Sequence, residues 1–125
     1  MGTIVLLPEQ TAWLESMNII KYEFDNVRGL VNVDGDVNLY RNNLTTLQGS
    51  PREVGGHFYC NNNKLTSLQG SPREVGVGFY CYNNNLTTLQ GAPREVGGDF
   101  SCYNNNFKTE PDHSFIDIGG EFDWR

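Results

Sequence analysis

Residues 35–55 read GDVNLYRNNLTTLQGSPREVG, residues 56–76 read GHFYCNNNKLTSLQGSPREVG, and residues 77–97 read VGFYCYNNNLTTLQGAPREVG. The three segments share one length, 21 residues, and largely one wording. A fourth unit begins at Gly98 with GDFSCYNNNF and then departs from the pattern. Self-similarity at a fixed period of about 20 to 50 residues is the signature of a repeat architecture. We therefore predict stacked repeats over residues 35–106.

Within each unit, apolar residues recur in five columns separated by polar and turn-forming residues. The columns are Val37, Phe58, Phe79 and Phe100; Leu39, Cys60, Cys81 and Cys102; Leu44, Leu65, Leu86 and Phe107; Leu47, Leu68 and Leu89; and Val54, Val75 and Val96. The first two columns alternate with polar positions, which predicts a short strand with one buried face. One unit cannot bury its apolar columns alone, whereas stacked units can. The expected fold is mainly β, a short parallel β-solenoid of 21-residue coils.

Asparagine occupies two neighbouring positions of every unit. We predict that Asn42, Asn63, Asn84 and Asn105 form a structural ladder, because an amide can donate to and accept from backbone groups at a turn under the core. The preceding residues Asn62, Asn83 and Asn104 suit the turn itself, since Asn tolerates left-handed backbone geometry.

The two ends of the repeat array differ from its middle, and each end is expected to form a cap. Residues 1–34 predict an amphipathic helix over residues 9–18, then a hairpin whose strands are residues 22–24 and 30–33. Residues 107–125 predict a modified terminal coil: Ile118-Gly119 regains the Val-Gly ending, and residues 120–124 resemble the first strand of a fifth unit. A chain of 125 residues is one domain overall.

These units resemble the short bacterial type of leucine-rich repeat, which Leu65-Thr66-Ser67-Leu68 matches, with 21 residues where that type has about 20. They are also similar to small leucine-rich-repeat-like proteins of tailed bacteriophages, and residues 28–39 match most of the segment that leads into the repeats there. The resemblance covers about residues 22 to 107. It implies a fold but no single activity, because repeat scaffolds serve many partners.

Composition limits the classes of function. The chain has 9 Lys and Arg against 15 Asp and Glu, a net charge of −6, which argues against general binding to a phosphate backbone. Acidic residues are concentrated in residues 1–36 and 108–125. No apolar run approaches the roughly 18 residues of a membrane span, and the apolar residues 4–7 lack the flanks of a secretory signal. The odd count of three Cys argues against a disulfide framework. We expect a cytoplasmic protein without a membrane partner.

Chemistry-bearing patterns are sparse. Cys60, Cys81 and Cys102 share a column with Leu39, so we interpret them as packing residues and not as metal ligands. Residues 32–38 carry oxygen side chains at alternate positions but lack the order of a calcium loop. The recurring Arg-Glu pairs at 52–53, 73–74 and 94–95 predict a solvated stripe of ion pairs. No catalytic, metal or cofactor motif is present, and we expect no enzyme activity and no cofactor.

The outward positions of the strands are the candidate binding site. They alternate with the buried Phe and Cys columns, and the residues singled out are Asn38, Tyr40, Tyr59, Asn61, Tyr80, Tyr82 and Tyr103. Tyrosine is enriched at recognition surfaces because it offers a large area at low entropy cost. Stacked tyrosines also stabilise a sheet as cross-strand pairs. Both interpretations stay open at this point.

The predicted function is a protein–protein interaction module. The resemblance to phage proteins implies a phage-encoded modulator or inhibitor of a host protein, for instance a defence component. Two alternatives remain: binding of a small ligand or nucleic acid on the Tyr/Asn face, and a self-assembling structural protein, such as a homodimer through the solenoid ends. Nucleic acid is disfavoured because only Arg41 and Lys64 lie near that face in the sequence.

Overall fold

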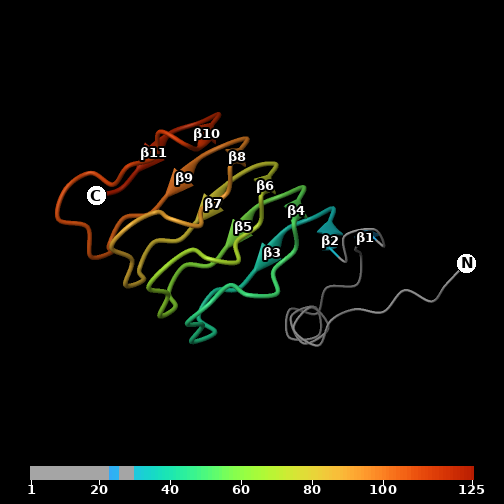
Figure 1. Ribbon diagram of the computed structural model, residues 1–125, viewed down its shortest axis with the longest axis horizontal. Helices are drawn as coiled ribbons and strands as arrows, with labels where there is room; N and C mark the ends of the chain where they lie inside the picture. The colour runs from blue at the N-terminus through green and yellow to red at the C-terminus, as the bar shows by residue number, and fades with distance from the viewer. Residues whose placement is uncertain (1–22, 26–29) are drawn as a thin grey trace, which may run out of the picture.

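A computed structural model gives the fold and describes residues 23–25 and 30–125 (Figure 1). The described chain winds into a parallel β-solenoid of about four coils, and it contains strands but no helix. We name residues 35–55, 56–76, 77–97 and 98–119 coils one to four. The strands are β1 (Glu23–Asp25), β2 (Leu30–Val33), β3 (Val37–Asn38), β4 (Glu53–Val54), β5 (Phe58–Tyr59), β6 (Glu74–Val75), β7 (Phe79–Tyr80), β8 (Glu95–Val96), β9 (Phe100–Ser101), β10 (Asp117–Ile118) and β11 (Phe122–Asp123).

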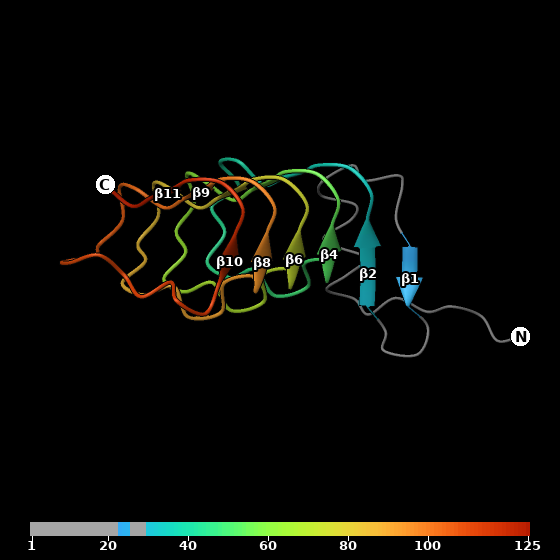
Figure 2. The ribbon, with the colours of Figure 1, turned by 90° about the horizontal axis from the view of Figure 1, so that it is seen from above.

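The strands form two sheets that run along the solenoid axis. One has six strands in the order β1-β2-β4-β6-β8-β10, and the other has five in the order β11-β9-β7-β5-β3. Figure 2 shows the first sheet as a row of neighbouring strands. Equivalent residues pair across coils, for example Val54 with Val75 and Phe58 with Phe79. In-register pairing therefore follows directly from the 21-residue repeat.

The N-terminal edge of the six-stranded sheet is a hairpin. Strand β1 pairs antiparallel with β2, and Phe24 lies opposite Val31. This confirms the predicted hairpin, whereas the helix predicted over residues 9–18 lies outside the described residues. From β2 onward every pairing in this sheet is parallel.

The predicted apolar columns form the interior. Phe58, Phe79 and Phe100 are fully buried, and their rings stack with centroids 5.3 and 5.1 Å apart. The Cys, Leu and Val columns are buried beside them, and they belong to the same continuous core. The exceptions are Leu44 and Phe107, which are half-buried members of the third column at the first and fourth coils. Stacking thus buries the apolar faces that a lone coil would expose.

The asparagine ladder holds the turn that follows each strand of the five-stranded sheet. In coil three, Asn84 Oδ1 accepts from Leu65 N at 3.0 Å, and Asn84 Nδ2 donates to the carbonyl oxygens of Cys60 and Cys81, both at 3.0 Å. Asn63 and Asn105 make equivalent contacts. The predicted ladder is confirmed for Asn63, Asn84 and Asn105, where it satisfies backbone groups beside the core, whereas Asn42 in coil one is exposed.

The residue before each ladder asparagine has a left-handed backbone. The φ angles of Asn62, Asn83 and Asn104 are 60°, 57° and 57°, as expected for Asn at a sharp turn. Coil one has Arg41 at this position, with φ of 55°. Arginine is uncommon in this region of backbone space, so coil one departs from the repeat here.

The C-terminal coil is longer by one residue, yet it returns to register. Ile118 pairs with Val96 and Phe122 pairs with Phe100, which confirms the predicted terminal coil and the start of a fifth unit. His113 stacks on Phe122 with ring centroids 3.7 Å apart. This imidazole extends the column of stacked phenylalanine rings at the C-terminal end.

Candidate binding surface

The tyrosine face lies on the outside of the five-stranded sheet. It has two rows: Asn38, Tyr59, Tyr80 and Ser101 form the first, and Tyr40, Asn61, Tyr82 and Tyr103 form the second. Backbone pairing aligns each row, because Tyr59 lies opposite Tyr80 and Asn62 N donates to Tyr82 O at 3.1 Å. Apart from Asn61, whose side chain is buried, the predicted site residues are therefore brought together on one surface.

Neighbouring tyrosine rings in each row are stacked. The Tyr59 and Tyr80 centroids are 4.9 Å apart with an interplanar angle of 11°, and those of Tyr82 and Tyr103 are 4.5 Å apart at 5°. These four side chains are half-buried, whereas Tyr40 is 45% exposed. Stacking fixes the rings and leaves part of each ring open to solvent. The two interpretations of the sequence, sheet packing and recognition, are compatible in this geometry.

His57 contacts two tyrosines of the first row, which sequence analysis did not predict. Its ring stacks on Tyr59 with centroids 5.5 Å apart, and Tyr80 Oη lies 3.1 Å from His57 Nδ1. The Tyr80 hydroxyl lies over Gly78, where a Cβ atom would overlap it. The signal in the sequence is the column His57, Gly78, Asp99: histidine in one coil and glycine in the next leave room for a hydrogen bond between coils.

The phenols of Tyr80 and Tyr82 stay neutral at neutral pH, because their pKa values are raised. Burial raises the pKa of Tyr80, and the nearby Tyr59, Asp99 and Asp36 add to the effect. Burial, and after it the neighbouring Tyr103, also raise the pKa of Tyr82. Tyr80 and Tyr82 therefore present uncharged hydroxyl groups as well as aromatic surface.

Asn61 does not face solvent as the alternation predicted. Its side chain is only 3% exposed, and Nδ2 donates to Asn62 Oδ1 at 3.1 Å. Asn62 Oδ1 also accepts from Asn83 Nδ2 at 3.2 Å, so the Asn62 side chain is held by hydrogen bonds to the asparagines on both sides of it. Asn61 Oδ1 is buried without a hydrogen-bond partner. A buried acceptor left unpaired costs roughly 1–3 kcal/mol.

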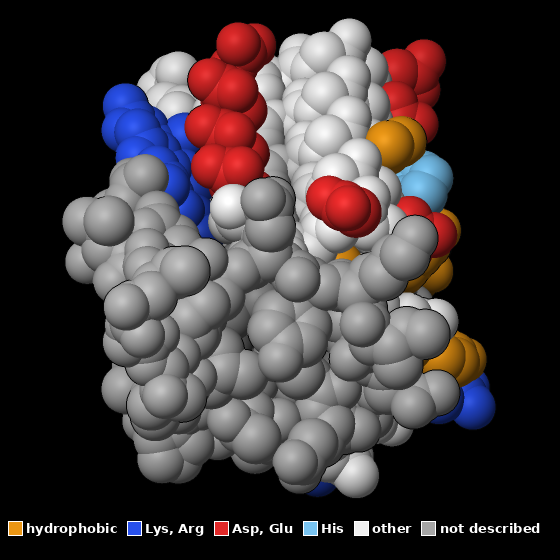
Figure 3. Space-filling model, turned by 90° about the vertical axis from the view of Figure 1, so that its right-hand side faces the viewer, with side chains coloured by type: hydrophobic (Ala, Val, Ile, Leu, Met, Phe, Trp, Pro, Cys, Tyr) orange, Lys and Arg blue, Asp and Glu red, His pale blue; other side chains and the backbone are white. Residues whose placement is uncertain are grey.

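A second surface feature follows the six-stranded sheet. Glu53, Glu74 and Glu95 pair in register and continue to Asp117, so a row of carboxylates runs along the solenoid. Figure 3 shows an acidic row beside a basic one, and the basic row contains Arg52, Arg73 and Arg94. Neighbouring like charges along such a row are unfavourable.

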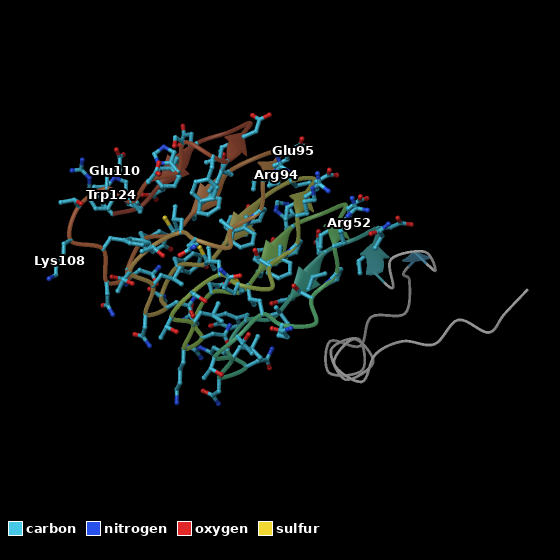
Figure 4. All side chains as sticks on the ribbon, viewed as in Figure 1. Arg52, Arg94, Glu95, Lys108, Glu110 and Trp124 are labelled. Carbon is cyan, nitrogen blue, oxygen red and sulfur yellow. The ribbon has the colours of Figure 1, made fainter. Side chains whose placement is uncertain are left out.

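The predicted stripe of ion pairs is present in sequence order but only partly in contact. Within the described ranges, Arg52 Nη1 and Glu53 Oε1, at 3.9 Å, are the one pair within 4.0 Å. Figure 4 shows Arg94 and Glu95 on the same side of the solenoid as Arg52. Such exposed pairs contribute little to stability.

A shallow groove runs beside the carboxylate row. It has a volume of about 450 Å³, and its walls include the carboxylates, the buried Val54, Val75 and Val96, and exposed glycines such as Gly76. A Cβ atom at Gly76 would overlap the carbonyl oxygen of Gly55, so close packing of coils requires glycine here. The groove was not predicted, because the pattern within one coil does not show how neighbouring coils pack.

The cysteine column is buried and reduced. Cys60, Cys81 and Cys102 are all free thiols with no exposed surface. Burial raises the pKa of each thiol, that of Cys102 to about 12. Over residues 23–25 and 30–125, no three His, Cys, Asp or Glu side chains are grouped so that they could hold a metal ion.

The acidic C-terminal end is exposed, as its sequence predicted. Five carboxylates are exposed in this segment: Glu110, Asp112, Asp117, Glu121 and Asp123. Hydrogen bonds from Ser114 lower the pKa of Asp112. At the other end, Asp34 and Asp36 are exposed, whereas Glu9 and Glu15 lie outside the described residues.

None of the described segments forms a helix long and apolar enough to cross a membrane. Comparisons of the chain with protein-family models, curated proteins and solved structures give no significant match.

Proposed function

We propose that this solenoid is a protein-binding module whose contact surface is the tyrosine face. The observation that supports it is the ordered stacking of Tyr59 on Tyr80 and of Tyr82 on Tyr103 on one sheet face. Rings that are already fixed lose little conformational entropy when a partner covers them. Tyrosine adds both apolar area and a hydroxyl group, which suits a protein surface.

The partner that we propose is a bacterial host protein. This step uses the similarity of the repeat wording to small phage proteins, and it assigns the chain a role in modifying or blocking a host factor such as a defence component. The neutral phenols of Tyr80 and Tyr82 favour a partner patch that is itself largely uncharged. Charge at the exposed C-terminal carboxylates would then influence the rate of association more than the affinity.

Self-association is the second candidate. Within the described part of the chain, β10 and β11 each pair on one side only, and Phe115 beside them is 48% exposed. An unpaired strand edge is a template for another strand. A mass that rises with protein concentration in sedimentation or light-scattering measurements would favour this candidate over binding to a host protein.

The test is a pull-down from a bacterial lysate, followed by binding of the purified captured protein. We compare the wild type with the triple variant Tyr59→Ser, Tyr80→Ser and Tyr82→Ser. The matched control is the triple variant Thr45→Ser, Thr66→Ser and Thr87→Ser, which changes exposed residues in the same three coils. All three proteins are first checked for folding by circular dichroism.

We expect one host protein to be captured by the wild type and by the threonine control but not by the tyrosine variant. Thermal unfolding of the tyrosine variant should remain within about 1–2 kcal/mol of the wild type if the rings serve binding. A variant that no longer folds would show that the rows are structural. Capture that is unchanged in a folded tyrosine variant would rule out this face.

A further inference from the structure

The groove beside the carboxylate row crosses every coil of the six-stranded sheet, whereas the tyrosine face belongs to the other sheet. Its walls carry charge of one sign, because the described residues that line it include five acidic residues and no Lys or Arg. The five are Asp34, Glu53, Glu74, Glu95 and Asp117. The charge of this lining favours a cation as the ligand.

The neighbouring arginines leave most of these carboxylates without an ion pair. Figure 3 shows the basic row on one side of the carboxylates and a strip of uncharged groups on the other. The groove follows the uncharged side, since glycines and not arginines line it. Among the described residues, only Glu53 has an arginine nitrogen within 4.0 Å, that of Arg52 at 3.9 Å. Carboxylates that pair in register repel one another, and a cation with several charges would relieve this repulsion.

The floor of the groove contributes a second row of hydrogen-bond acceptors. The carbonyl oxygens of Gly55, Gly76 and Gly97 each lie where a Cβ atom on the next glycine of the row would be. Glycine in this row therefore keeps the oxygens free of a covering side chain, and all three residues are exposed. Within residues 23–25 and 30–125, none of the three oxygens accepts a hydrogen bond. These acceptors are open to donors from outside the chain.

We propose that this groove binds a linear polyamine, and that this site is independent of the protein-binding role of the tyrosine face. Each ammonium group donates to a carboxylate of the row and to a carbonyl oxygen of the floor. The methylene segments between the ammonium groups lie over the glycines. A lining that only accepts hydrogen bonds matches an ammonium group, which only donates them, and the charge on both partners strengthens each bond.

The spacing of the carboxylate row matches the distance between the nitrogens of a polyamine. Glu53, Glu74 and Glu95 lie on paired strands, which are about 4.8 Å apart in a sheet. Two nitrogens joined by three methylene groups lie about 5 Å apart when extended, because single bonds are about 1.5 Å long. A chain of aminopropyl units therefore stays in register with the row over several coils.

Two other cations fit this groove less well. In an extended basic peptide, side chains on one face recur about every 6.7 Å, so successive cations fall out of register with the carboxylates. A metal ion needs several ligands around one point, and no three His, Cys, Asp or Glu side chains of the described residues are grouped in that way. Both are outcomes that the following experiment separates from a polyamine.

The experiment measures binding to the full chain by isothermal titration calorimetry at low ionic strength. The ligand is a linear tetraamine in which three methylene groups separate neighbouring nitrogens. Three further probes are its fully N-methylated analogue, which keeps the four charges but has no N–H group, tetralysine and calcium chloride. NMR shifts of the backbone amides of Gly55, Gly76 and Gly97 report whether the ligand lies in the groove.

Two double variants are compared with the wild type. The groove variant, Glu74→Gln and Glu95→Gln, removes two charges from the middle of the row, keeps the shape of the side chains and removes a repulsion, so it should fold. The matched control, Glu110→Gln and Glu121→Gln, removes two exposed charges that do not line the groove. Figure 4 shows Glu110 near the C-terminal end, apart from Glu95. Circular dichroism checks the folding of both variants.

We expect saturable binding of one tetraamine per chain, with the NMR shifts concentrated in the glycine row. The groove variant should bind at least about tenfold more weakly, because it loses two charge-assisted contacts. The control variant should stay within about twofold of the wild type, since distant exposed charges are screened. The N-methylated analogue should bind at least about tenfold more weakly than the tetraamine, because it cannot donate to the carbonyl oxygens. Tetralysine and calcium should also bind more weakly.

Absence of saturable tetraamine binding at millimolar concentrations would overturn the proposal. Equal losses in the two double variants would also overturn it, because net charge alone would then attract the ligand. The same holds for equal binding of the N-methylated analogue and for tighter binding of calcium or of tetralysine, which would make the groove a metal or a peptide site. The groove variant retains every residue of the tyrosine face, so its capture of a host protein reports on the protein-binding proposal separately.

Discussion

At the residue scale, one amide per coil determines whether the chain can turn beside its core. Asn84 accepts from one backbone N–H and donates to two backbone carbonyls that belong to neighbouring coils. Few side chains can do both, because a carboxylate only accepts and an ammonium only donates. The repeated asparagine is therefore a requirement of the stack and not a sign of a site.

The substitution Asn84→Asp tests this requirement. It keeps the size of the side chain but places a carboxylate against the carbonyl oxygens of Cys60 and Cys81. We expect a loss of about 2–4 kcal/mol in the free energy of unfolding, measured with urea. The control Asn85→Asp makes the same charge change at the exposed neighbouring position and should stay within about 0.5 kcal/mol. Similar losses in both variants would contradict the role of the ladder.

The buried thiols make stability depend on alkaline pH. Burial raises the pKa of Cys60, Cys81 and Cys102 above the ordinary value of 9.0. Above that value the unfolded chain releases protons that the folded chain retains, so rising pH favours unfolding. Their contribution is complete below about pH 9 and declines as pH rises toward the folded values.

We therefore expect the urea midpoint of the wild type to fall between about pH 8 and about pH 10.5. The triple variant Cys60→Ala, Cys81→Ala and Cys102→Ala should show a shallower fall, although it is less stable throughout because it leaves small cavities. Comparison of slopes removes the shared effects of Tyr and Lys titration. Parallel slopes in the two proteins would show that the thiols do not contribute.

At the element scale, the sequence predicted the strands of the five-stranded sheet, but it did not predict that β4, β6, β8 and β10 are strands, nor every side chain beside them. The columns of Phe, Cys, Leu and Val were predictable because each residue type recurs at one spacing in several coils. The register follows from the same spacing. The sequence also predicted the extra residue in the last coil, because Ile118-Gly119 repeats the Val-Gly ending of the other coils one residue late.

The prediction failed for Asn61, and the reason is local. Alternation along a strand places every second residue outward. Strand β5 ends at Tyr59, however, and the backbone turns at the left-handed Asn62. The same turn occurs at Asn83 and Asn104, where the equivalent Tyr82 and Tyr103 are only half-buried, so the difference lies in the side chain. The shorter side chain of Asn61 is buried and bonds to the side chain of Asn62. The contact between His57 and Tyr80 and the groove beside Glu74 both depend on contacts between coils, which a pattern within one coil does not show.

At the scale of the whole molecule, the solenoid is a one-dimensional stack in which each coil contacts its neighbours. Ring stacking runs from Phe58 through Phe79 and Phe100 to Phe122, and it ends on His113. In such an array, stability is close to a sum of coil and interface contributions. The solenoid has only about four coils, so a substitution that unfolds an interior coil removes its interfaces with both neighbouring coils, which is a large share of all the interfaces.

The substitution Leu65→Asp in coil two tests this dependence. Leu65 is fully buried, so an aspartate there would place a charge in the core with no partner. We expect a loss of more than about 4 kcal/mol, which is comparable with the whole stability of a small domain, and therefore an unfolded chain. Circular dichroism and the dispersion of amide NMR signals measure the outcome. The control Thr66→Asp adds the same charge at the next, exposed position and should remain folded. A Leu65→Asp protein in which coils three and four stay ordered would show that the coils fold in separate units, because cooperative stacking requires loss of coil two to spread to its neighbours.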